Sequence, residues 1–251
     1  MLEKYPSDFK NLYTQKIVQT PYMTRVYTYK KYISHNFTVN RETYEKSHEG
    51  DKQEISLRRT RDNLALLIQC NIKPYSKFLT LTTQENIQER SVFLDKFKAF
   101  KRAFKRKYGY AIKYSAVMET QKRGAWHIHL VAYNLTQKLD YQEIDRLWQR
   151  VAGKGHVDFK VVDSHKNMFK YLIKYLTKEE TQINKKAILN SQGLERPEII
   201  TTRESYDYQT IYGEPNFKAT WTLYHGDRSD FENGNVNMEL FDSCDMHEWH
   251  K

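Results

Sequence analysis

The sequence lacks the features that define several protein classes. Its 251 residues include two cysteines, Cys70 and Cys244, so no disulfide framework is indicated and a reducing cytosol fits best. No apolar run approaches the length of a membrane span, and Met1–Pro6 provides no apolar signal core. There is no Gly-x-x-x-x-Gly-Lys-Ser/Thr motif, so no P-loop NTPase or attached helicase is visible. These absences predict a cytoplasmic protein without a membrane partner.

Aromatic side chains and positive charge are abundant instead. The chain is 39% hydrophobic and 14% aromatic, which is enough to bury a core. The formal net charge is +10 and the isoelectric point is about 9.3. Such an excess favours a polyanionic partner, most often nucleic acid. Charge alone leaves open the alternative of a basic protein without such a partner.

The middle of the chain alternates between strand-like and helix-like patterns. In order, we expect strands or helices at 78–83 (strand), 88–108 (helix), 111–120 (strand), 126–131 (strand), 140–151 (helix), 156–162 (strand) and 166–179 (helix). This order predicts an α+β fold, in which helices pack on one face of an antiparallel sheet in the split β-α-β manner.

The helix expected at 88–108 combines an apolar stripe with many basic residues. Four phenylalanines recur at intervals of three or four residues: Phe93, Phe97, Phe100 and Phe104. Seven lysines and arginines lie between and after them: Lys96, Lys98, Lys101, Arg102, Lys105, Arg106 and Lys107. For most of them a solvated face is the expected role, and contact with phosphates is an alternative for some.

The two flanks of this region are less informative. Residues 23–39 have the composition of one or two strands, 40–51 that of a polar loop, and 56–70 the spacing of a helix. Residues 217–224 are expected to form a strand, and the last residues, from Asp227, are acidic. A role of the N-terminal flank in DNA recognition is a hypothesis that rests on its basic residues.

A pair of histidines marks the first candidate site. His127 and His129 are separated by one residue in a strand, so both point to the same face. Glu119 ends the preceding strand, and a hairpin would bring it close to both. Two imidazoles and one carboxylate form a mixed nitrogen and oxygen site that Mg²⁺ or Mn²⁺ could complete with water and substrate oxygens. The alternatives are a chance His-x-His triplet and an ordinary carboxylate at a strand end.

The helix expected at 166–179 carries the second candidate site. Its apolar side chains occupy one arc, and Tyr171, Lys174, Tyr175 and Lys178 fall together on the opposite side. Positive charge lowers the pKa of a phenol and so favours a phenolate nucleophile. The alternative is two surface tyrosines, because Tyr-x-x-x-Tyr spacing alone is not specific.

The order of these motifs resembles that of the HUH endonucleases, specifically the rolling-circle replication initiators (Rep proteins) of small phages and plasmids. Residues 78–83 are similar to their first motif, and His127-Ile128-His129 to their metal motif, with Glu119 where many place an acidic ligand. Residues 171–178 are similar to the two-tyrosine form of their nucleophile motif. The resemblance implies a ferredoxin/RRM-like catalytic domain at 75–180, with an N-terminal extension at 1–74 and a C-terminal extension at 181–251.

The resemblance also implies an activity. A Rep protein nicks and joins one strand of single-stranded or hairpin origin DNA through a covalent 5′-phosphotyrosine, with a divalent metal, Mg²⁺ or Mn²⁺. Tyr171, Tyr175 or both would be the nucleophile, Lys174 and Lys178 would assist, and Glu119, His127 and His129 would bind the metal. The expected partners include the helicase and polymerase of a bacterial host, in whose cytoplasm the protein would act.

Two other functions remain open. A transposase or a relaxase could have the same fold and chemistry, although relaxases usually use three histidines where this chain has Glu119. A non-catalytic nucleic-acid-binding module with an RRM-like sheet would bind without a metal, and it would leave Glu119, His127 and His129 unexplained.

Overall fold

The computed structural model describes residues 12–34, 49–135, 140–161, 188–205, 207, 217–224 and 235–242, and gives side chains at 12–29, 59–135, 140–160, 188–205 and 207. The chain divides into two compact units: unit 1 comprises Met1–Arg58 and Arg196–Lys251, and unit 2 comprises Arg59–Glu195. These boundaries are structural. The division into functional segments at 74/75 and 180/181 stays a prediction.

Unit 2 is an α+β unit, as the sequence predicts. Its elements are β3 (Lys77–Thr83), α3 (Arg90–Tyr108), β4 (Tyr114–Thr120), β5 (Trp126–Ala132), α4 (Tyr141–Ala152), β6 (Gly155–Val161) and β7 (Ile188–Asn190). The strands form one antiparallel sheet in the order β6-β3-β5-β4-β7. The helix expected at 166–179 lies outside the described residues.

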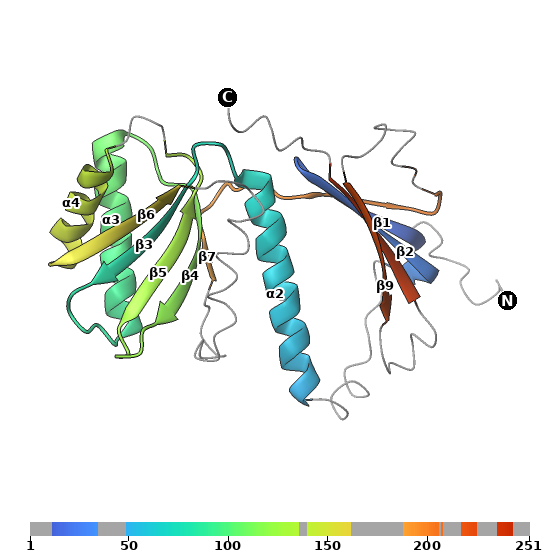
Figure 1. Cartoon of the computed structure of the whole chain (residues 1–251), viewed down its shortest axis with the longest axis horizontal. Coiled ribbons are helices and arrows are strands. Elements are labelled where there is room, and N and C mark those ends of the chain that lie inside the picture. The colour runs from blue at the N-terminus through green and yellow to red at the C-terminus, as the bar shows by residue number, and fades with distance from the viewer. Residues whose placement is uncertain are drawn as a thin grey trace. The chain divides into compact units, whose positions relative to one another are not determined.

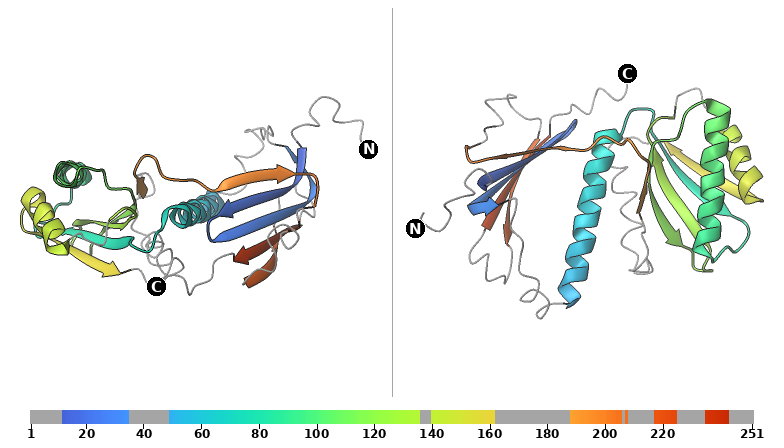
Figure 2. Two further views of the ribbon diagram at one scale, coloured as in Figure 1. Left: turned by 90° about the horizontal axis from the view of Figure 1, so that it is seen from above. Right: turned by 180° about the vertical axis from the view of Figure 1, so that it is seen from behind.

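The topology of unit 2 is the split β-α-β arrangement. Both β3 and β4 pair antiparallel with β5, so they run parallel to each other with β5 between them, and α3 connects them. The strand β6 pairs with the free side of β3 after the α4 crossover. The order β6-β3-β5-β4 is therefore that of a ferredoxin-like fold. Figures 1 and 2 show α3 and α4 on the same face of this sheet.

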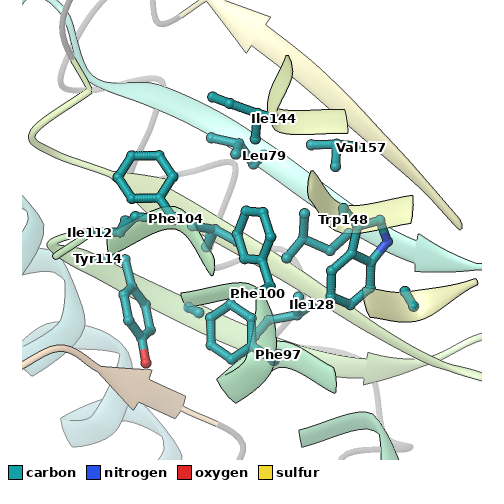
Figure 3. Packing of buried hydrophobic residues seen from close by; sticks show 14 of the residues in the cluster. Leu79, Phe97, Phe100, Phe104, Ile112, Tyr114, Ile128, Ile144, Trp148 and Val157 are labelled. Atoms are coloured by element: carbon teal, nitrogen blue, oxygen red, sulfur yellow. The ribbon is translucent and has the colours of Figure 1, made fainter. Parts of the chain in front are cut away.

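The core of unit 2 lies between the sheet and these two helices. The four phenylalanines of α3 are all buried, as their spacing predicts. They pack against Trp148 of α4 and against alternate residues of the strands, among them Leu79, Ile128 and Val157 (Figure 3). Phe93 and Phe100 contact the Trp148 indole with ring centroids 5.9 and 5.7 Å apart. One face of each strand is thus committed to this aromatic core.

Local signals fix the ends of the two helices. The side chain of Glu89 accepts a hydrogen bond from the Ser91 amide at the start of α3, and Asp140 accepts one from the Gln142 amide at the start of α4. Gly109 ends α3 in the left-handed conformation, with φ of 80°, and its amide donates to the Lys105 carbonyl.

Unit 1 contains a second antiparallel sheet, in the order β8-β1-β2-β10-β9. Its strands come from both ends of the chain: β1 (Leu12–Thr20), β2 (Met23–Ser34), β8 (Glu198–Thr202), β9 (Phe217–Tyr224) and β10 (Asn235–Asp242). The strands expected within 23–39 and at 217–224 are confirmed as β2 and β9. The other three strands were not predicted.

The long helix α2 (Glu49–Asn71) begins in unit 1 and ends in unit 2. It confirms the helix predicted at 56–70. The prediction of a polar loop at 40–51 is wrong for its last three residues, Glu49–Asp51, because α2 already begins there. A polar sequence is compatible with an exposed helical turn, so polarity alone did not separate the two. In the described part of the chain, no helix is long and apolar enough to cross a membrane.

Candidate active site

The face of the unit 2 sheet that points away from α3 and α4 carries the predicted histidine site. Because side chains alternate along a strand, Ile128 and Leu130 enter the aromatic core while His127 and His129 point to the opposite face. Glu119 of β4 is the direct cross-strand partner of His127. The hairpin therefore brings all three side chains onto one face.

The hairpin between β4 and β5 is fixed at its turn. The Gly124 amide donates to the Gln121 carbonyl over 2.8 Å, and Gly124 has φ of 83°, where glycine is favoured. The guanidinium of Arg123 donates to the backbone carbonyls of Thr83 and Gln84, over 2.8 and 3.0 Å. These bonds hold the turn against the end of β3. Arg123 was not predicted from the sequence, because a turn arginine resembles any other solvated charge.

The three side chains are buried. The exposed fractions are 7% for Glu119, 9% for His127 and 6% for His129. Burial of such polar groups costs free energy unless they are hydrogen-bonded or ligated. His129 meets this requirement on both sides of its ring: Nε2 lies 3.2 Å from Glu119 Oε2, and Nδ1 lies 3.1 Å from Thr80 Oγ1.

Thr80 of β3 is a member of the site that the sequence did not single out. It is the cross-strand partner of His129, and its hydroxyl contacts Nδ1. The predicted strand at 78–83 contained the signal, since its alternation places Thr80 on the face opposite Leu79 and Leu81. The Phe78 ring stacks on His129 at a centroid distance of 6.1 Å and an interplanar angle of 21°.

The Thr80 hydroxyl lets His129 adopt either neutral tautomer. With the proton on Nε2, His129 donates to the Glu119 carboxylate and Nδ1 accepts from Thr80. With the proton on Nδ1, His129 donates to Thr80 Oγ1, and the lone pair of Nε2 faces Glu119. The second arrangement is the one that metal-binding histidines use, where a partner at the far nitrogen fixes the ring.

The fit of this cluster to a divalent metal is partial. Metal–ligand bonds of about 2.1 Å place neighbouring ligands of an octahedral ion about 3 Å apart, which is close to the 3.2 Å between His129 Nε2 and Glu119 Oε2. The ring of His127 lies farther away, with its centroid 6.2 Å from that of His129. In the part of the chain that the structure describes, no group of three or more His, Cys, Asp or Glu residues is arranged to hold a metal. The Glu119–His129 pair fits a metal, and the full triad stays a prediction.

The second predicted site cannot be located. Tyr171, Lys174, Tyr175 and Lys178 lie outside the described residues. Their proximity to Glu119 and the histidines therefore stays a prediction.

Comparison with known proteins reaches the same part of the chain. A family model of replication-associated proteins, those of the ORF2 type, matches residues 76–180. The match runs from just before β3 to beyond β6, so it includes Thr80, Glu119 and both histidines, and it extends over both tyrosines. No curated protein and no solved structure matches the chain. The chain is thus similar to replication-associated proteins over this region, which supports a role in replication.

Proposed function

We propose that the protein is a rolling-circle replication initiator that nicks and rejoins one strand of origin DNA through a phosphotyrosine link. The observation that supports this most directly is the buried contact of His129 with Glu119 and Thr80, in a region similar to replication-associated proteins. A sheet that only bound nucleic acid would gain nothing from burying this pair. The HUH chemistry, the phage or plasmid origin and the bacterial cytoplasm are parts of the proposal.

In the proposed reaction, the phenolic oxygen of Tyr171 or Tyr175 attacks the phosphorus of a phosphodiester. A bond forms between phosphorus and the tyrosine oxygen, and the bond to the 3′ oxygen breaks. The phenol loses its proton, the leaving 3′ oxygen gains one, and Lys174 and Lys178 assist these transfers. The products are a 5′-phosphotyrosine and a free 3′-hydroxyl. Attack by that hydroxyl, or by another, reverses the step and rejoins the strand.

Glu119, His129 and His127 are the residues that would hold a divalent cation, Mg²⁺ or Mn²⁺. Such a cation, when bound, supplies positive charge that stabilises the developing charge on phosphoryl oxygens. This chain contributes the positioning. Thr80 fixes the His129 ring, Arg123 holds the hairpin against β3, and burial excludes water from the carboxylate. In such a dry environment the charge of Glu119 acts more strongly than it would in water.

The proposal is tested by covalent trapping. A labelled single strand from the origin of the replicon that encodes the protein is incubated with the full chain and Mn²⁺, and a denaturing gel is read for a protein–DNA adduct. The variants are Tyr171→Phe, Tyr175→Phe and His129→Ala. We expect the adduct to disappear with EDTA and in His129→Ala, and to disappear in whichever tyrosine variant lacks the nucleophile. Survival in both single variants would show that either tyrosine can act.

Two matched controls make the result specific. Tyr141→Phe changes an exposed tyrosine of α4, which lies on the helix-covered side of the sheet. His156→Ala removes an exposed histidine of β6 that pairs with Asp145 over 3.3 Å. Both should keep the adduct. If DNA binds but no adduct forms on either origin strand, the nickase proposal fails and the non-catalytic binding module takes its place.

A further inference from the structure

The outer face of α3 is the most strongly charged surface among the described elements. Its 19 residues contain eight basic residues and one acidic residue, Asp95, a net charge of +7 out of +10 for the whole chain. The phenylalanine stripe turns one side of the helix into the core, so the basic residues gather on its flanks and outer side. This face lies on the opposite side of the sheet from Glu119 and the histidines.

The basic residues of α3 fall into two groups. The lysines of the first group are already engaged: Lys98 with Asp95 at 2.8 Å, Lys107 with Glu143 at 2.7 Å and Lys96 with Glu85 at 3.9 Å. Lys101 donates to the Tyr114 hydroxyl over 3.0 Å and lies over the Phe97 ring. These residues are accounted for by contacts within unit 2.

The second group is Arg102, Lys105 and Arg106, which we call the α3 triad. All three side chains are exposed, and none forms an ion pair with another residue in the described part of the chain. At about 100° and 1.5 Å per residue, the three lie within one turn and face the solvent together. A favourable interaction with the C-terminal end of the helix dipole accounts for part of their presence. It does not require three cations on the outer side.

The chemistry of this face fits phosphates and not bases. Single-stranded nucleic acid is bound by combining cations with exposed aromatic rings on which bases stack. On α3, all four phenylalanines are buried, and the Tyr108 hydroxyl donates to Glu143 over 3.2 Å. Burial, and then Glu143, raise the pKa of Tyr108 to about 12. A row of cations without stacking rings matches the backbone of a duplex, which is bound through phosphates regardless of sequence.

We propose that the α3 triad binds the phosphate backbone of duplex DNA, on the face of unit 2 opposite the candidate active site. This inference rests on the proposed function for its biological setting: a nickase acts on a strand that continues into duplex DNA on either side. Contact with that duplex through a separate face holds the protein at the origin without occupying the site where the strand is cut.

The test measures the affinity of the full chain for a short fluorescent duplex of arbitrary sequence, by fluorescence anisotropy at several salt concentrations. The variant is Arg102→Gln/Lys105→Gln/Arg106→Gln. The matched control is Lys96→Gln/Lys98→Gln/Lys107→Gln, which removes the same charge from the same helix but takes it from engaged lysines. Circular dichroism and thermal unfolding verify that both variants fold.

The expected result follows from counterion release. Each lost phosphate contact reduces the slope of log affinity against log salt by about 0.9. Between about 50 and 200 mM salt, the unmodified chain and the control should therefore lose about forty-fold more affinity than the triad variant does. Equal slopes for the triad variant and the control would overturn the proposal, and so would the absence of duplex binding by the unmodified chain.

Covalent trapping on a single strand separates this inference from the proposed function. The triad variant should form the adduct on an origin oligonucleotide as well as the unmodified chain does, because the triad lies on the other face of the sheet. Loss of the adduct in the triad variant would place these residues in the catalytic machinery and overturn the inference. Loss of the adduct in every protein, with the duplex result intact, would defeat only the nickase.

Discussion

The two faces of the unit 2 sheet use the same strands for opposite purposes. On one face, Leu79, Ile128 and Met118 join the aromatic rings of α3 and α4 in a core that contains almost no polar atoms. On the other face, the neighbouring residues Thr80, His129 and Glu119 bring polar groups into the sheet, and the histidine and the carboxylate are buried. The first face gains free energy from every buried apolar group. The second loses free energy by burial and recovers it only through specific contacts.

The difference shows where stability and function are separated. A buried polar cluster next to a complete apolar core is not needed for folding, because apolar residues of similar size would satisfy the fold at least as well. We therefore assign stability to the helix-covered face and chemistry to the polar face. The following four predictions test this division, from the largest expected effect to the smallest.

Truncation on the helix-covered face should cost the most stability. Phe100 is fully buried against Trp148, so Phe100→Ala should lower the free energy of unfolding by about 3–5 kcal/mol. Urea unfolding measures this. Val92→Ala changes an exposed residue of the same helix and should stay within about 0.5 kcal/mol of the unmodified protein. A small loss for Phe100→Ala would mean that this face is not the main source of stability.

Divalent metal should stabilise the protein through the polar face. A cation that binds the folded state alone, at about 100 times its dissociation constant, adds about 2.7 kcal/mol. Thermal unfolding should therefore occur at a higher temperature in Mn²⁺ than in EDTA. The shift should vanish in His129→Ala and persist in His156→Ala. An equal shift in His129→Ala would place the metal elsewhere and break the division between the faces.

Gly155 tests how tightly the helix-covered face closes around the end of β6. A Cβ atom added there would lie 2.6 Å from both the Thr82 carbonyl oxygen and Trp148 Nε1, two atoms that are themselves hydrogen-bonded. Gly155→Ala should cost about 1–3 kcal/mol by overpacking and change the tryptophan fluorescence. Gly109→Ala meets open space, so its strain should leave the fluorescence unchanged. Unchanged fluorescence in both variants would contradict the prediction.

Thr80→Val should have the smallest effect on stability and a distinct effect on the metal. Loss of the hydroxyl next to His129 Nδ1 should cost about 1 kcal/mol, and Mn²⁺ affinity should fall because the ring loses its positioning partner. Thr82→Val is the matched control on the same strand, where the hydroxyl donates to the His156 carbonyl instead. Calorimetric titration with Mn²⁺ separates them. Equal affinity in both variants would remove Thr80 from the site.

The fold of unit 2 could be predicted because its signals are local. The four phenylalanines of α3 specify a helix and its buried face, and the alternation in β3 and β5 specifies which side chains share a face. The connection order then limits the topology to a few arrangements, of which the split β-α-β unit is one. The contact of Glu119 with His129 followed from the same logic, since a hairpin places cross-strand residues side by side.

Unit 1 could not be predicted for the converse reason. The strand β1 pairs with β8, and β2 pairs with β10, so strands near the start of the chain find partners in its last quarter. Such pairing leaves no local signal, and a strand of mixed polar composition such as Leu12–Thr20 is recognised only through its partners. The roles of Thr80 and Arg123 were missed similarly, because each depends on a neighbour across the sheet or turn.

The construction of the unit 1 sheet has a consequence for how the protein is made. Its strands β1 and β2 are synthesised first and β9 and β10 last, whereas unit 2 is one uninterrupted stretch, Arg59–Glu195. Domains fold as they emerge from the ribosome, so unit 2 can complete its core while β1 and β2 still await their partners. The first segment to leave the ribosome is therefore among the last to reach its native pairing, and a prematurely terminated chain would contain the candidate metal site without the second sheet.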